Sequence, residues 1–304
     1  MIGSLGVSIF FVLSGYLITG VLLHEEEMGS LSLLRFYGRR ALRIFPAFYV
    51  FLAVLGILVS IGWLPQQDSK TWLASAFYFR NIYGSQWDTA HLWSLSLEEQ
   101  FYAAWPVAFM LTKRCRLPFI VVSIIAFTLH RAIGLHGHSI DSFYSSPDLR
   151  MDTFLIGAAF AIRRRKFDVP PELAASLLAV WFPFALVAPL LRPLDTAVSA
   201  FLIGCLIVWI VENSNSWIGR LFSARRIVGL GVVSYSIYLW QQIFLGPHLR
   251  LWSLPALALM SFLSYRFVER PALRLKNRWN WVAPARLSES SANIKKVQIQ
   301  EARL

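Results

Sequence analysis

The sequence predicts an all-α protein, a polytopic bundle of transmembrane helices, from three observations. The 304 residues are 56% hydrophobic and only 15% charged, with a mean hydropathy of +0.53. Apolar runs of membrane-spanning length recur along the chain, and basic residues concentrate in the segments between them. The net charge of +12 therefore reflects arginines distributed around a membrane rather than a nucleic-acid-binding surface.

Nine apolar runs account for most of residues 1–268. The run at 150–162 is short for a span, but Arg150 precedes it and the basic sequence RRRK follows it at 163–166. Counting this run gives about nine crossings in one membrane domain. The runs lie at about 3–23, 47–64, 92–112, 116–133, 150–162, 173–190, 196–212, 227–247 and 251–268.

The charges of the connecting segments predict the orientation. Because cytoplasmic loops are enriched in Lys and Arg, the side that carries the basic segments is the cytoplasmic one, and the C-terminus lies there. Nine crossings then place residue 1 outside, and one further helix ahead of Met1 would be a simpler arrangement. The basic segments are Arg35 to Arg43, KRCR at 113–116, RRRK at 163–166, Arg220 with Arg225 and Arg226, and the tail.

Two segments fall outside the nine runs. Residues 65–90 contain TWLASAFYFRNIYG, which is apolar but interrupted by Arg80 and Asn81, so an interfacial or re-entrant segment is expected. Residues 269–304 are polar and basic, and after the membrane domain 1–268 we expect a cytoplasmic tail that is disordered or lies on anionic lipid. The chain has two cysteines, for which neither a disulfide nor a metal site is expected.

Polar residues interrupt the apolar run at 92–112. On a helix at about 100° per residue, one sector of roughly 80° would hold four of them: His91, Ser94, Glu98 and Tyr102. A carboxylate in hydrocarbon is costly unless it is paired, protonated or facing a cavity, so this stripe predicts a functional site. The structural alternative is that Ser94 bonds a backbone carbonyl and Glu98 pairs with an arginine of another helix.

The first basic segment carries a second candidate site. Arg39, Arg40 and Arg43 lie one turn apart on a short amphipathic helix that should end where Pro46 opens the next run. Guanidinium groups bind phosphate bidentately, so this triplet suits a nucleotide-bearing donor. The alternative is that the triplet anchors the loop to anionic lipid headgroups.

A third candidate lies at the predicted outer end of the run 150–162. The sequence SPD at 146–148 predicts a helix start just ahead of Arg150 and Asp152. Arg150 could pair with Glu98 or bind an acceptor. The alternative is a plain interfacial salt bridge.

These motifs resemble those of the acyltransferase 3 family of bacterial integral membrane O-acyltransferases. The resemblance implies a full fold of ten helices and transfer of an acyl group, commonly acetyl from acetyl-CoA, to a sugar hydroxyl. The matching segments occur in the family's order and span almost the whole chain: LGVSIFFVLSGYLIT at 5–19, FYGRRALRIFPAFY at 36–49, HLWSLSLEEQFYAAWP at 91–106, RMDTFLIGAAFA at 150–161, VSYSIYLWQQ at 233–242 and SYRFVERPALRL at 264–275.

The resemblance also implies residue roles. Arg40 and Arg43 match the family's RxxR, assigned to the donor, and Ser94 and Glu98 match its SxxxE. Ser8 stands where aspartate is usual. The family's first helix, with an arginine and a histidine regarded as the catalytic base, would precede the point at which this sequence begins.

We therefore expect a multi-pass acyltransferase of the bacterial inner membrane. It would move an acyl group from acyl-CoA, a co-substrate rather than a bound cofactor, to a hydroxyl of a carbohydrate, glycolipid or other cell-surface or secreted acceptor. The alternatives are a glycolipid transporter or flippase and a catalytically impaired member of the family. Neither a metal nor nucleic acid is expected. The expected catalytic residues are Glu98, Ser94 and His91; the donor-binding residues are Arg39, Arg40 and Arg43; the acceptor-binding residues are Arg150, Asp152 and Tyr102.

Overall fold

The computed structural model describes residues 2–84, 86–134, 150–163, 170–187, 192–246 and 252–278. The secondary structure of these residues is helical, without a strand among them, which confirms the predicted all-α class. Within them, five helices are long and apolar enough to cross a membrane: Leu5–Glu27, Leu33–Ser60, Arg116–Ile133, Leu194–Glu212 and Arg225–Phe244. The protein is thus a multi-pass membrane protein, and the count of nine crossings stays a prediction.

The chain divides into two compact units, each assembled from segments that are distant in sequence. Unit 1 comprises Met1–Leu31, Lys70–Ser85 and Leu92–Gly219. Unit 2 comprises Ser32–Ser69, Gln86–His91 and Arg220–Leu304.

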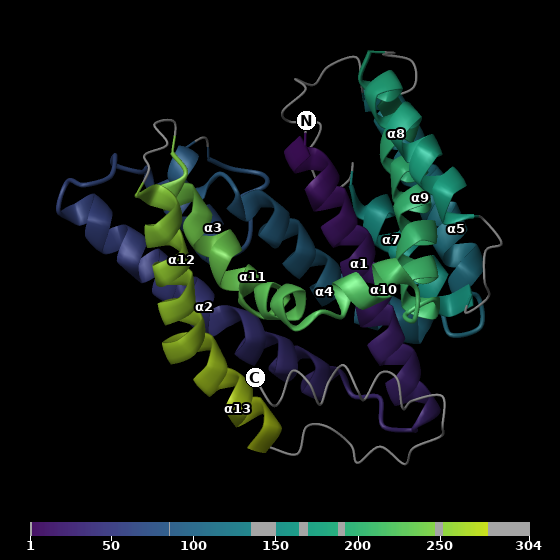
Figure 1. Ribbon diagram of the computed structural model, residues 1–304, viewed down its shortest axis with the longest axis horizontal. Helices are drawn as coiled ribbons and strands as arrows, with labels where there is room; N and C mark the ends of the chain where they lie inside the picture. Colours follow the sequence, from purple (N-terminus) through teal and green to yellow (C-terminus); the bar gives the residue numbers. More distant parts are fainter. Residues whose placement is uncertain are drawn as a thin grey trace. The chain divides into compact units, whose positions relative to one another are not determined.

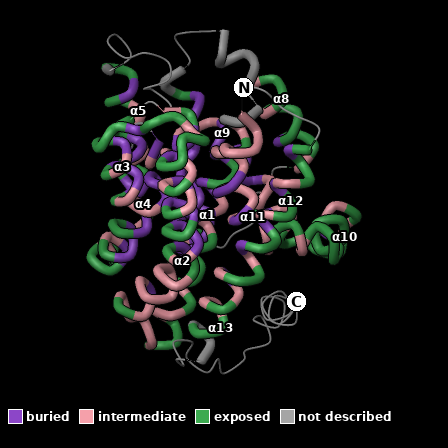
Figure 2. The backbone as a smooth tube through the Cα atoms, turned by 90° about the vertical axis from the view of Figure 1, so that its left-hand side faces the viewer, coloured by how far each residue is buried: buried purple, intermediate pink, exposed green. Residues whose placement is uncertain are grey.

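Unit 1 is organised around α7. This helix packs chiefly against α1 and also against α5 and α9, while α8 packs on α9 (Figure 1). Buried residues, purple in Figure 2, are frequent on α1 and α4. The helices are α1 (Ile2–Glu27), α3 (Ser69–Ala76), α4 (Leu92–Leu111), α5 (Arg116–Gly134), α7 (Met151–Arg163), α8 (Pro171–Val187), α9 (Arg192–Glu212) and α10 (Trp217–Phe222), which ends in unit 2.

The α1 and α7 helices approach until their backbones touch. A Cβ atom added at Gly15 or at Gly157 would lie well within 3.0 Å of a carbonyl oxygen of the other helix, that of Phe154 or of Val12. Small residues permit such approach in membranes, where van der Waals packing rather than the hydrophobic effect holds helices together. With 13 residues, α7 is only about 20 Å long. It is nevertheless buried along most of its length, because neighbouring helices surround it.

Unit 2 is built on one long helix, α2. The last three elements follow one another without interruption from Ser253 to Arg278, and η4, a π-helical turn, contacts α2. The elements are α2 (Leu33–Ser60), η1 (Trp87–Thr89), α11 (Arg225–Phe244), α12 (Ser253–Ser264), η4 (Tyr265–Glu269) and α13 (Arg270–Arg278).

The structure corrects two boundary predictions in unit 2. The helix expected to end at Pro46 continues through it, so the arginine triplet and the following span form one helix of 28 residues that begins after the N-cap Ser32. Proline removes one backbone donor, and helices in membranes tolerate this loss when neighbours re-satisfy the freed groups. In the tail expected to be disordered, Glu269 ends η4 and residues 270–278 form α13, which packs against η4 and α2; residues 279–304 of that prediction lie outside the described residues.

The segment expected at the interface, 65–90, contributes a buried cation. Arg80 is buried, and its guanidinium donates to the carbonyl oxygens of Tyr83 at 3.2 Å and Gly84 at 2.6 Å. The backbone N–H of Arg80 also donates to the Ser96 hydroxyl on α4 at 3.3 Å. This arginine therefore fixes a turn against α4 instead of facing lipid headgroups.

The glycine contact predicts a matched pair of variants. Gly15→Ala should lower the free energy of unfolding by about 1–3 kcal/mol, because the added methyl group overlaps backbone atoms that cannot move aside. Gly20→Ala, on the same helix, meets no atom within 4 Å and should be neutral or stabilising. Titration of the purified protein with a denaturing detergent measures both, and equal stabilities would contradict the assigned contact.

Candidate active site

The Glu98 carboxylate is buried within unit 1 and held by two hydroxyl groups. Its Oε1 accepts a hydrogen bond from Ser14 Oγ of α1 at 2.9 Å. The same oxygen accepts a short hydrogen bond from the Tyr102 hydroxyl, one turn further along α4. Glu98 is 5% exposed. Two O–H donors on one oxygen stabilise the ionised form, which compensates part of the cost of burying a charge.

A second contact fixes α4 against α1 beside this carboxylate. Trp105 Nε1 donates to the Thr19 hydroxyl at 2.8 Å. Aromatic rings continue the packing into α7, since Phe154 stacks on Phe11 of α1 with ring centroids 4.2 Å apart and on Phe101 of α4 at 4.6 Å. These rings pack α1 and α4 against α7 in the buried interior of unit 1.

Three members of the predicted stripe share α4, and the fourth does not. Ser94 is buried one turn before Glu98, in line with the prediction, and Tyr102 follows one turn after. His91 precedes α4 and belongs to unit 2, where its Nε2 lies 3.1 Å from the Leu239 carbonyl oxygen. His91 thus lies one residue ahead of the helix that carries the other three, and its catalytic role stays a prediction.

The contacts of His91 fix its ring within unit 2. The ring meets Phe51 and Tyr238 edge-on at centroid distances of 5.7 and 5.3 Å, and the Tyr238 hydroxyl donates to the His91 carbonyl. A bond from Nε2 to a carbonyl oxygen requires the proton on Nε2.

A buried ion pair lies at the start of α7. Asp152 Oδ2 accepts from Arg131 Nη2 of α5 at 2.6 Å and from the Thr196 hydroxyl of α9 at 3.0 Å. The side chains of Arg131 and Asp152 are both fully buried. The sequence analysis considered an interfacial salt bridge at Arg150 and Asp152; in the structure Asp152 instead pairs, fully buried, with Arg131, which the sequence analysis did not single out.

Arg150 lies beside this pair and reaches α1. Its Nη1 donates to Ser8 Oγ at 3.2 Å, and its charge interacts with Asp195 of α9, which also accepts from Ser199 at 3.0 Å. Two arginines and two aspartates thus gather where four helices meet. Their opposite charges balance, which is how ionised groups are retained in a membrane protein.

The arginine triplet lies on α2 in unit 2. Arg39, Arg40 and Arg43 share the first turns of one helix, as the spacing predicted, and Arg43 is exposed. Arg43 also acts electrostatically on Glu269, which ends η4 and accepts a hydrogen bond from the buried Ser236. Burial raises the pKa of Glu269, while the Ser236 hydrogen bond and the Arg43 charge offset part of that increase.

Comparison with known proteins indicates the family of this chain. The family model for the acyltransferase domain matches residues 1–268. The peptidoglycan O-acetyltransferase OatA of Listeria monocytogenes is 29% identical over 321 residues, covering 88% of this chain and 51% of the relative. The O-acetyltransferase OatA of Staphylococcus aureus is 26% identical over 333 residues, with 88% and 52% covered. The chain thus spans about half the length of these curated relatives. No solved structure matches it.

The helical membrane fold and these matches define the class as membrane-embedded O-acyltransferases. The chain belongs to the acyltransferase 3 family, as the resemblance of its motifs implied.

The buried ion pair predicts a large stability effect. Arg131→Met should lower the free energy of unfolding by about 3–5 kcal/mol, because it leaves the Asp152 carboxylate buried without its cation. Adding Asp152→Leu should recover part of the loss. Lys113→Met is the control: its side chain is 70% exposed and lies 3.4 Å from Glu26, so about 0–1 kcal/mol is expected. Equal losses in the two single variants, measured by detergent titration, would contradict the assignment.

Proposed function

We propose that this chain transfers an acyl group, acetyl in the first instance, from acyl-CoA to a hydroxyl of a carbohydrate acceptor. The observation that carries the proposal is the buried Glu98 carboxylate, held by Ser14 and Tyr102 inside a membrane-embedded unit. Membership of the acyltransferase family favours this reaction over a transporter or flippase. The Listeria relative is named a peptidoglycan O-acetyltransferase, which supports a polymeric cell-wall sugar as the acceptor.

The reaction has three chemical steps that the protein must support. The acceptor oxygen attacks the thioester carbonyl carbon, its proton passes to a base, and the C–S bond breaks to release CoA, whose thiolate takes up a proton. Glu98 supplies a fixed negative charge that can orient the acceptor hydroxyl or a protonated base. Ser94, one turn away on α4, is placed to hydrogen-bond beside it. A carboxylate already bonded by two donors suits this positioning role better than repeated proton transfer.

Binding of the acyl-CoA donor is assigned to the arginine triplet on α2. The helix is about 42 Å long, longer than the hydrocarbon core of about 30 Å, so its arginine-bearing first turns extend beyond the apolar layer. Guanidinium groups three and four residues apart can bind the phosphates of CoA together. Arg150 and Asp152 remain the proposed acceptor-binding residues, at the predicted outer end of unit 1.

The proposal predicts that Glu98→Gln strongly reduces turnover. The protein in nanodiscs is supplied with acetyl-CoA and cell-wall glycan fragments, and release of free CoA is measured. Loss of the charge should lower kcat/KM by at least about 100-fold, the usual contribution of a positioned acid–base or electrostatic group. Glu99→Gln is the matched control, since it makes the same change one residue along, on a side chain that is only partly buried.

The KM for acetyl-CoA and the kcat of the variants distinguish a defect in donor binding from a defect in catalysis. Arg40→Gln with Arg43→Gln should raise KM for acetyl-CoA more than it lowers kcat, whereas Glu98→Gln should lower kcat with binding of CoA intact. Acetyl transfer that is unaffected by Glu98→Gln would refute the assigned role of this carboxylate. Glycan translocation without CoA release would favour the transporter alternative.

A further inference from the structure

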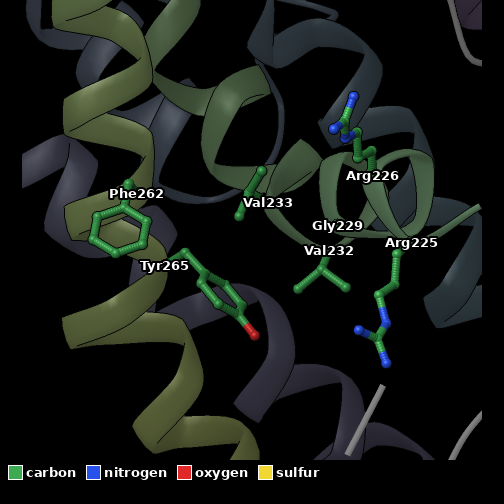
Figure 3. Close-up of a pocket in the computed structure, with 7 residues that line it drawn as sticks. All are labelled: Arg225, Arg226, Gly229, Val232, Val233, Phe262 and Tyr265. Carbon is green, nitrogen blue, oxygen red and sulfur yellow. The ribbon is translucent and has the colours of Figure 1, made fainter. Parts of the chain in front are cut away.

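An open groove in unit 2 lies between the first turns of α11 and the junction of α12 with η4. Its volume is about 260 Å³, and it is lined by Arg225, Arg226, Gly229, Val232, Val233, Phe262 and Tyr265. In Figure 3 the Tyr265 hydroxyl and the Val232 side chain point into the same space, and the Arg225 guanidinium lies beside them. Arg226 extends from the other side of the same helical turn (Figure 3).

Among the described residues, the two arginines have no anionic side chain as a partner. Both are exposed, and in the described part of the chain neither guanidinium makes a hydrogen bond or an ion pair. Two adjacent cations without a carboxylate partner favour binding of an external anion. The Tyr265 hydroxyl adds one donor on the opposite wall of the groove.

The remainder of the groove is apolar, and further apolar side chains are exposed on the same helical segments. Val232, Val233 and Phe262 line it, and Phe262 is 56% exposed. Leu230 and Phe267, from the same two helical segments, are exposed as well. A cation at one end and an aliphatic and aromatic wall at the other match a molecule with a phosphate head and a hydrocarbon tail.

We infer that this groove binds an anionic phospholipid. The phosphate contacts Arg225 beside the Tyr265 hydroxyl, and Arg226 adds positive charge from the same helical turn. The Tyr265 hydroxyl donates to the phosphate or the ester oxygens, and one acyl chain follows Val232 and Phe262. The predicted orientation places the first turn of α11 on the cytoplasmic side, where anionic lipids attract basic residues close to a span. The volume lies below the usual range of about 300–1,000 Å³ for small-molecule sites, which favours part of a lipid over a whole CoA molecule.

This site is separate from the proposed chemistry. Its lining includes neither the arginine triplet of α2 nor any residue of the Glu98 site. The inference therefore stands or falls independently of acyl transfer, and its test needs no catalytic turnover.

The glycines of α11 offer a matched test. No atom lies within 4 Å of a Cβ added at Gly229, which lines the groove, or at Gly231, which does not. Gly229→Leu therefore fills the groove without a backbone clash, and Gly231→Leu makes the same change outside it. Arg225→Gln with Arg226→Gln removes the cations from an exposed position, where folding is unaffected.

Native mass spectrometry of the detergent-solubilised protein measures retention of added phosphatidylglycerol, with phosphatidylcholine of the same chains as the comparison lipid. The wild type should retain phosphatidylglycerol preferentially. The double arginine variant should weaken its binding roughly 30-fold, from the usual contribution of two basic residues near a membrane surface. Gly229→Leu should abolish the preference, and Gly231→Leu should leave it unchanged.

Several outcomes would overturn the inference. Equal retention of the two lipids, or an equal loss in both glycine variants, would mean that no specific lipid site exists here. Displacement of phosphatidylglycerol by CoA at matched concentration would assign the groove to a nucleotide instead. Displacement by inorganic phosphate alone would reduce it to an anion site without an acyl-chain component.

Discussion

Contact between the backbones of α1 and α7 is the constraint on which the rest of unit 1 depends. Gly15 sits against Phe154 of α7, and its neighbour Ser14 donates to Glu98 of α4. Ser8, about two turns earlier, accepts from Arg150. A side chain at Gly15 would push α1 outward, and both hydrogen bonds would lengthen with it. One small residue thus sets the position of two polar contacts.

In unit 1, the polar side chains of α1 form hydrogen bonds with residues of neighbouring segments. Ser8, Ser14 and Thr19 are all buried; Ser8 accepts from Arg150 just ahead of α7, and Ser14 and Thr19 both bond side chains of α4. Full charges are balanced locally, as Asp152 is by Arg131. Such pairs contribute little net stability relative to apolar packing, but losing one partner is expensive. They therefore specify which helices meet rather than strengthening the bundle.

The helices could be predicted from sequence because apolar runs report burial or lipid contact directly. The stripe of Ser94, Glu98 and Tyr102 followed from helical spacing alone. The partners of those residues could not be predicted, since Ser14 and Glu98 are 84 residues apart and nothing in either run indicates which helices pack. Arg131 was missed because a cation at the end of an apolar run is typical of a membrane boundary. The π-helical turn and the helix after it depend on contact with α2, a tertiary effect.

The pairing of α1 with α7 also constrains how the chain is made. Ser8 and Arg150 are 142 residues apart, so at about 5–20 residues per second the ribosome needs roughly 7–30 seconds to supply the partner of α1. During this interval the hydroxyl groups of α1 face lipid or the insertion machinery, where they bond their own backbone or water. Biosynthesis of unit 1 is therefore a delayed assembly, in which α1 is synthesised long before α7, the helix it packs against most closely, becomes available.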